Sequence, residues 1–249
     1  MRSTHNTERA ARVDLAAAYR LADHHGLSEG ICNHLTLAVP GEDDRYLLIP
    51  FGMHWSEVTA SSLLVVDGDG NVIDGDGIAE PTAFLIHGAV HRARPDAACV
   101  MHTHMRAALA LCMVEDGGLH MADQNACRFF GRTATMSAFD GVVLDEAKAT
   151  PIVDAIGGHD VLFMANHGVV VTGRTVARAW EDLYFLERAC AAQVAAMSTG
   201  RPLRRVPDAD AAAIAADVAR EAESGLCTAD NFFSASKRLL DRCNPGYDA

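Results

Sequence analysis

The sequence predicts an α/β protein that folds as a three-layer α/β/α sandwich. Three observations lead to this prediction: strand-like apolar segments are mixed with segments of helical periodicity, the first and last elements are helical, and 49% of the 249 residues are hydrophobic, enough for a sizeable core. No internal repeat or low-complexity linker divides the chain. We therefore expect one domain over residues 1–249, in which residues 207–249 form a helical C-terminal tail.

The chain is expected to begin with a helix. In residues 8–25 the apolar side chains recur at helical spacing, and Gly26 ends the pattern. Three strands are expected next, because apolar or alternating segments follow one another between turn-forming residues, over residues 33–39, 45–50 and 62–67. The turn-rich stretch "GDGNVIDGDG" then predicts a hairpin whose second strand is short.

A second helix is predicted over residues 80–93. Pro81 suits its first turn, where the missing backbone N–H costs nothing, and the helix ends before Pro95. The stretch "AACVMHTH", residues 97–104, is apolar enough for a buried strand, and a short helix over residues 105–114 is expected to follow it.

The remaining elements are two apolar strands and a helical end. The strands are expected over residues 160–166 and 167–173. The pattern of residues 175–197 predicts the longest helix of the chain, with Thr175 as its N-cap. Residues 207–249 predict one or two helices that end in the loose segment "NPGYDA".

The charge and composition exclude several kinds of partner. The net charge is −12 and no long run of basic residues occurs, so we expect neither nucleic acid nor a membrane surface as a partner. The N-terminus lacks an apolar signal-peptide core, and no apolar stretch is long enough to span a membrane. The seven cysteines form no CxxC pair, which is typical of reduced thiols. We expect a cytoplasmic protein whose partner is a small molecule.

Three histidines stand where predicted strands meet turns. His102 and His104 are two residues apart, so on a strand they point to the same face and can reach one ion. The alternative is a structural pair whose rings are hydrogen bonded at a strand end, and the short HxH pattern alone leaves both open. His167, in "LFMANHGVVV", adds a third imidazole at such a place. Three nitrogens with open coordination positions are typical of a catalytic metal site.

Another histidine pair has metal-binding spacing. His87 and His91 are four residues apart on the second predicted helix. No acidic residue stands between them as in HExxH, so a structural role is favoured.

The stretch "EPTAFLIHGAVHRARPDAACVMHTH", followed later by "LFMANHGVVVTG", resembles the class II aldolase/adducin family, and the resemblance runs from the first helix to about residue 200. It implies that His102, His104 and His167 bind a divalent ion, commonly zinc, and that Glu80 serves as acid/base. Manganese or another first-row ion is the alternative, because neutral nitrogens fit several such ions. The resemblance also implies a mostly antiparallel central sheet and a homotetramer with sites near subunit interfaces.

The loops that hold phosphate in sugar-phosphate members of the family are altered here. Asn33 and Gly52 match the family pattern, whereas Phe51 occupies a threonine position and apolar residues replace a serine pair, at Ile78 and Ala79. A phosphate dianion needs hydroxyl or charge-assisted hydrogen bonds to offset its desolvation. We therefore expect an unphosphorylated substrate, with a flat apolar part against Phe51 and Ile78.

Other segments resemble the branch that holds adducins and 3-hydroxy-2-methylpyridine-4,5-dicarboxylate decarboxylase. These segments are "FGMHWSEVTAS", "QNACRFFG" and "DLYFLERA". Within them or nearby, Gln124 and Arg128 are expected to contact substrate, Arg128 through a carboxylate. His34, in "NHLT", either points to the substrate or is a loop histidine bonded to backbone.

Together these features predict a divalent-metal-dependent carbon–carbon lyase. Its substrate would be a small unphosphorylated hydroxy-oxo compound or a hydroxy-aromatic carboxylate, cleaved by decarboxylation or retro-aldol reaction through a metal-stabilised enolate. Both reactions use the same electron sink, so both stay open. The alternatives are a non-catalytic adducin-like module for binding or oligomerisation, and a sugar-phosphate aldolase or epimerase.

Overall fold

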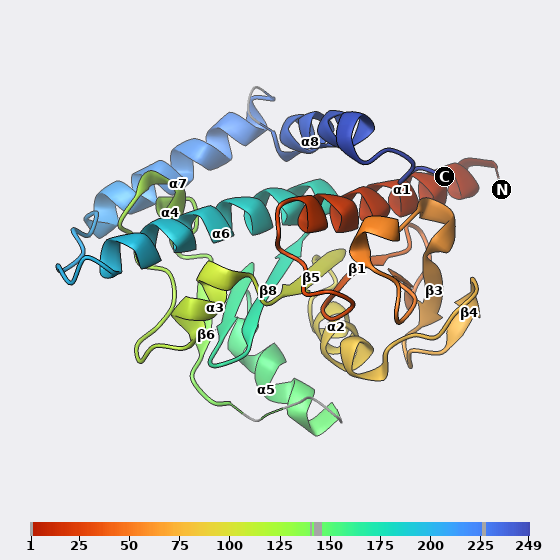
Figure 1. Ribbon diagram of the computed structural model, residues 1–249, viewed down its shortest axis with the longest axis horizontal. Coiled ribbons are helices and arrows are strands. Elements are labelled where there is room, and N and C mark those ends of the chain that lie inside the picture. The colour runs from red at the N-terminus through yellow and green to blue at the C-terminus, as the bar shows by residue number, and fades with distance from the viewer. Residues whose placement is uncertain (1, 140, 142–145, 226–227) are drawn as a thin grey trace.

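A mixed sheet lies at the centre of the protein, with helices on both faces (Figure 1). The computed structural model describes residues 2–139, 141, 146–225 and 228–249. The strands are β1 (His34–Ala38), β2 (Arg45–Leu48), β3 (Leu64–Asp67), β4 (Val72–Asp74), β5 (Cys99–Thr103), β6 (Thr133–Met136), β7 (Val161–Met164) and β8 (Gly168–Gly173).

Among the described residues the sheet has eight strands, in the order β4-β3-β2-β1-β5-β8-β7-β6. Neighbouring strands are antiparallel, except that β6 is parallel to β7. The predicted mostly antiparallel sheet is therefore confirmed.

The helices include two long ones that cross the same face of the sheet. The α-helices are α1 (Arg2–His24), α2 (Pro81–Ala93), α3 (Arg106–Cys112), α4 (Gln124–Cys127), α5 (Glu146–Ile156), α6 (Val176–Met197), α7 (Asp208–Glu223) and α8 (Ala229–Cys243), and short 3-10 turns are η1 (Trp55–Glu57) and η2 (Ala60–Ser62). In Figure 1, α1, α6 and α8 lie above the sheet and α2 and α5 lie below it, which gives three layers.

Each helical layer has its own apolar core against the sheet. Under α1, α6 and α8 the core includes Leu15, Leu21, Trp180, Leu183 and Phe233. The opposite core joins α2 and α5 to the sheet and includes Ile86, Val90, Ile152, Ile156 and Leu162. The three-layer α/β/α sandwich predicted from the sequence is thus confirmed.

Most predicted elements are present, and the differences have local causes. Thr175 caps α6 through its side chain, which accepts from the backbone N–H of Arg178. However, α6 has 22 residues and α1 has 23, so the prediction that α6 is the longest helix is wrong. The pattern did not predict β6, whose residues "TATM" are only partly buried, or α5, which contains Pro151.

One edge of the sheet collects the ends of three central strands. β5 runs antiparallel to both β1 and β8, so its carboxyl end meets their first residues. His34 of β1 pairs with His102 of β5, and Thr103 pairs with Val169 of β8. This edge therefore brings together polar residues from distant parts of the chain.

No helix in the described ranges is both long and apolar enough to cross a bilayer.

Candidate metal centre

A cavity of about 580 Å³ opens at this edge of the sheet. Its walls come from the start of β1, the residue before α2, the end of β5, and the turn between β7 and β8. The lining residues are Ile31, Cys32, Asn33, His34, Phe51, Glu80, Ile86, His102, His104, Leu109, Phe139, Gly141, Asn166 and His167.

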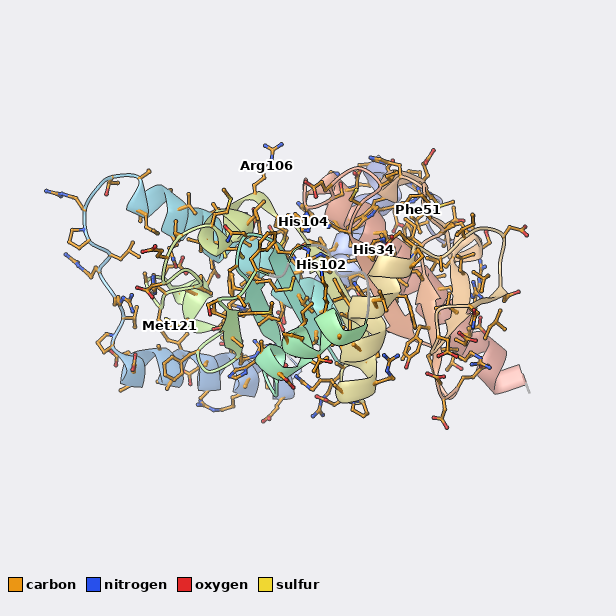
Figure 2. The ribbon with its side chains drawn as sticks, turned by 90° about the horizontal axis from the view of Figure 1, so that it is seen from below. His34, Phe51, His102, His104, Arg106 and Met121 are labelled. Atoms are coloured by element: carbon orange, nitrogen blue, oxygen red, sulfur yellow. The ribbon has the colours of Figure 1, made fainter. Side chains whose placement is uncertain are left out.

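Three histidines converge on one point of this cavity. His102 lies near the end of β5, His104 directly follows this strand, and His167 comes from the turn that precedes β8. One nitrogen of each ring lies within 4.8 Å of the other two, and the ring centroids are 4.9, 5.0 and 5.1 Å apart. Figure 2 shows His102 and His104 next to each other, with His34 beside them. The spacing is small enough for one cation to contact all three rings.

Hydrogen bonds orient two of these rings. The Nδ1–H of His102 donates to the carbonyl oxygen of Val169, at 3.0 Å, and the Nδ1–H of His104 donates to the carboxylate of Glu29, at 2.5 Å. Each ring therefore keeps a lone pair on Nε2, which is the arrangement seen in metal-binding histidines. The Nε2 of His104 is buried and has no hydrogen-bond partner among the described residues.

Burial also favours the neutral, metal-binding form of two of the rings, His102 and His167. Burial, followed by the neighbouring rings of His167 and His104, lowers the pKa of His102 well below its ordinary value. Burial and His104 lower the pKa of His167 to about 4. Neutral imidazoles do not have to lose a proton before they bind a cation. The donor set thus fits a divalent metal ion.

Gly168 explains why a glycine follows His167. A Cβ at this position would lie 2.7 Å from Cδ2 of His104 and 2.7 Å from the carbonyl oxygen of Thr103, and the φ angle of +152° also disfavours a side chain. The absence of a side chain lets β8 approach the ring of His104. Gly168 therefore allows His104 and His167, which adjoin different strands, to converge.

Glu80 supplies a carboxylate to the same cavity. It directly precedes α2, where the positive end of the helix dipole favours a negative charge. Its charge raises the pKa of His34, but the burial of His34 outweighs this effect and lowers that pKa to about 4. A carboxylate and a neutral imidazole therefore face the cavity beside the three-histidine cluster.

The predicted substrate contacts are only partly brought together. Asn33, His34 and Phe51 line the cavity, and the side chain of Asn33 accepts from the backbone N–H of His104. Gly52 and Ile78 are not among the lining residues. Ile78 is adjacent to the cavity, because its carbonyl oxygen accepts from the N–H of Phe51 at 2.8 Å, and its side chain is 70% exposed.

Gln124 and Arg128 do not lie at this cavity, so the prediction that they contact its substrate is not supported. Arg128 donates to Glu181 at 2.9 Å and stacks over the ring of Phe185. Met121, three residues before Gln124, lies far from the labelled histidines in Figure 2. The carboxylate of Glu181, in α6, pairs with the arginine that the sequence suggested for a substrate carboxylate, while Nε of Arg128 has no hydrogen-bond partner among the described residues.

His87 and His91 share a hydroxyl group and do not form a metal pair. The Nδ1–H of His91 donates to the carbonyl oxygen of Ala97, so its Nε2 accepts from the hydroxyl of Thr36, at 2.8 Å. The Thr36 hydroxyl then accepts from Nδ1–H of His87, also at 2.8 Å. The structural role favoured for this pair agrees with these contacts.

Several residues at the site were missed by the sequence reasoning. Glu29 orients His104, and the cavity-lining residues that were not predicted include Ile31, Phe139 and Asn166. Asn166 was visible in the "NHG" stretch, where its positive φ of 56° suits an asparagine in a tight turn. Nothing in the local sequence marks the other three.

Comparisons with known sequences agree with this geometry. Residues 13–194 match the model of the class II aldolase and adducin N-terminal domain. A protein of Caulobacter vibrioides whose name places it among class 2 aldolases is 38% identical over 240 residues, covering 95% of this chain and 91% of its own. Alpha-adducin of Rattus norvegicus is 36% identical over 200 residues, which cover 78% of this chain but 27% of the adducin.

Solved structures share the fold. An aldolase II superfamily protein from Pseudomonas syringae superposes with a TM-score of 0.89 at 34% identity, over 98% of this chain and 96% of that one. L-fuculose 1-phosphate aldolase from Glaciozyma antarctica gives a TM-score of 0.85 at 24% identity, over 97% and 94% of the two chains. The family model and the relatives together show that the chain belongs to the class II aldolase and adducin family.

Proposed function

We propose that the protein is a divalent-metal-dependent carbon–carbon lyase. The observation that carries the proposal is the convergence of three imidazole nitrogens in a cavity that also holds a carboxylate. His102, His104 and His167 would hold the ion, with zinc as the first candidate and manganese or another first-row ion as the alternative. When bound, the ion would stabilise the negative charge that develops on a substrate oxygen as the carbon–carbon bond breaks.

Glu80 would move the proton of the reaction. In a retro-aldol cleavage its carboxylate takes the proton of the hydroxyl group whose carbon becomes the carbonyl product. In a decarboxylation its carboxyl group delivers a proton to the carbon that has lost carbon dioxide. Both roles need a carboxylate that faces the cavity, and the position of Glu80 directly before α2 supports this.

Neighbouring residues of the chain would position the substrate. Asn33, His34 and Phe51 face the same cavity as Glu80. Gly52, next to Phe51, has a φ of +87°. Apart from its chain neighbours, no described atom lies within 4 Å of the position that a Cβ would take, so there is open space beside this residue. Ile78 would contact the part of the substrate that extends past Phe51.

The residues of this loop region also bear on the class of substrate. By the resemblance to sugar-phosphate members of the family, Phe51, Ile78 and Ala79 would occupy positions that carry hydroxyl side chains in a phosphate site. Their apolar character supports an unphosphorylated hydroxy-oxo or hydroxy-aromatic carboxylate substrate.

We also infer that the functional oligomeric state of the protein is a homotetramer. The proposal follows from the family membership, and light scattering coupled to size-exclusion chromatography tests it directly. A monomer at micromolar concentration would contradict it.

The rival function is a non-catalytic binding module. It is favoured by the match to alpha-adducin over 78% of the chain. Metal analysis of protein purified without chelator separates the two: a protein that holds no divalent ion and cannot be reloaded would favour the module. The cluster His102, His104 and His167 supports the lyase, because one nitrogen of each ring lies within 4.8 Å of the other two, as a shared metal ion requires.

The activity test uses metal-loaded protein and a panel of compounds. The panel contains unphosphorylated hydroxy-ketones, hydroxylated aromatic carboxylates and, for the sugar-phosphate alternative, matched phosphorylated hydroxy-ketones. Release of aldehyde or of carbon dioxide from an unphosphorylated compound supports the proposal and distinguishes the two reactions. Turnover of the phosphorylated compounds alone would contradict the proposed substrate class.

A further inference from the structure

The outer wall of the cavity is apolar. Ile31, Phe51 and Phe139 line the cavity and are 44%, 56% and 56% exposed. Each therefore presents a large apolar surface to solvent. The buried Ile86 and the half-buried Leu109 also line the cavity. Exposed aromatic and branched side chains gathered around a concave site are typical of surfaces that a ligand covers.

The described part of this wall offers no countercharge for an anion. Among the described lining residues there is no lysine, arginine, serine or threonine, and the charged residue is Glu80. Arg106 follows His104 by two residues, but Figure 2 shows its side chain pointing away from the histidines into solvent. An anionic group placed against this wall would lose its hydration without gaining a hydrogen-bonded countercharge, which is unfavourable.

We propose that Ile31, Phe51 and Phe139 form a specificity wall that selects a substrate with an apolar, planar group beside its chelating oxygens and with no further anionic group. The inference rests on the proposed metal-dependent function, because the chelating oxygens are those that would meet the ion held by the three histidines. It goes beyond that function by assigning a recognition role to two side chains, Ile31 and Phe139, and by defining the chemistry of the substrate's other end.

Three hydroxamates test the wall, because they share the same two chelating oxygens and differ in the attached group. Acetohydroxamate carries a methyl group, benzohydroxamate a phenyl ring, and phosphoglycolohydroxamate a phosphate. Dissociation constants are measured by calorimetry on the metal-loaded protein, so no turnover is needed. We expect benzohydroxamate to bind ~10-fold more tightly than acetohydroxamate, since the ring buries apolar area, and phosphoglycolohydroxamate to bind more weakly than either.

Substitutions in the specificity wall test whether its side chains cause this preference. Phe51→Ala and Phe139→Ala should each reduce the preference for benzohydroxamate over acetohydroxamate by about 3- to 10-fold, while the affinity for acetohydroxamate stays the same. Phe51→Leu should retain part of the preference. Val72→Ala, in β4, is the matched control, because Val72 is exposed and apolar but does not line the cavity. The oligomeric state of each variant is measured in parallel.

The outcomes separate the wall from the metal centre. Tighter binding of phosphoglycolohydroxamate than of acetohydroxamate would overturn the specificity wall, and so would an unchanged preference in both alanine variants. Either result leaves the proposed lyase standing. If none of the hydroxamates binds the metal-loaded protein, the proposed function itself is contradicted, and the inference that rests on it is lost as well.

Discussion

The ring of His102 donates its Nδ1–H to the carbonyl oxygen of Val169, 3.0 Å away on the neighbouring strand. Val169 follows Gly168 and stands two residues after His167, so the segment that carries one candidate ligand also orients another. This bond directs Nε2 of His102 towards the other rings, and the register of β5 and β8 sets it. The pairing of β5 with β8 therefore helps to orient a candidate metal ligand.

Removing a ligand should remove the metal and leave the fold. We expect His102→Ala and His167→Ala to lower the affinity for zinc by more than about 100-fold, because loss of a hydrogen bond to a ligand alone lowers affinity 10- to 100-fold. Mass spectrometry measures the bound metal, and circular dichroism checks that the fold is retained. His24→Ala provides the control, since His24 is exposed at the end of α1. Full metal content in both variants would rule out the ligand assignment.

Replacing the acid/base should separate binding from turnover. Glu80→Gln keeps the shape of the side chain but cannot exchange a proton, so we expect the metal content of the wild type and a turnover rate lower by about 100- to 10,000-fold. Glu42→Gln is the matched control at an exposed glutamate. Wild-type turnover by the Glu80 variant would exclude this residue from the proton transfer.

A glycine that binds nothing should still control metal affinity. In Gly168→Ala the new methyl group would meet the ring of His104 at 2.7 Å, so the ring or β8 must move. We expect zinc affinity to fall about 10- to 100-fold, as for other changes that misorient a ligand. Gly158→Ala is the control, because no described atom lies within 4 Å of its Cβ position. Titration with a competing chelator gives both affinities, and equal values for Gly168→Ala and the wild type would contradict the packing argument.

The central strands and the histidine cluster could be predicted because their signals are local. On the strand expected over residues 97–104, His102 and His104 share a face, and His167 follows an apolar strand, so the local sequence marks each of the three. Glu29 could not be predicted, because it reaches His104 across 75 positions of sequence. Arg128 shows the converse: its partner Glu181 lies 53 positions away, and the sequence alone suggested a substrate contact.

The weaker elements of the fold lacked such signals. β6 is an edge strand of four residues, so the alternation of Thr with Ala and Met in "TATM" is too short to predict a strand. α5 contains Pro151, a residue that normally argues against a helix interior, and tertiary packing of Ile152 and Ile156 outweighs that preference.

The buried histidines should make the fold sensitive to acid. Burial lowers the pKa of His91 to about 4, whereas an unfolded histidine has a pKa of about 6.5. Between these values the unfolded chain binds a proton that the folded chain excludes, so the free energy of unfolding falls as the pH drops from about 6.5 to 4. For His91 the full difference corresponds to about 3 kcal/mol, and burial of His87 acts in the same direction.

Urea unfolding of metal-free protein across this pH range measures the effect. His91→Gln should be less stable at neutral pH, because it loses the bonds to Thr36 and Ala97, but its stability should depend less steeply on pH. His24→Gln serves as the exposed control. A variant slope as steep as that of the wild type would show that His91 does not titrate with folding.

The most direct measurement is an anomalous diffraction map of a crystal of zinc-loaded protein, recorded at the zinc absorption edge. The account predicts one strong peak about 2.0–2.1 Å from a single ring nitrogen of each of His102, His104 and His167, with Glu80 outside the coordination shell. A peak held by other residues, or no peak between these three rings in fully loaded protein, would contradict the central claim.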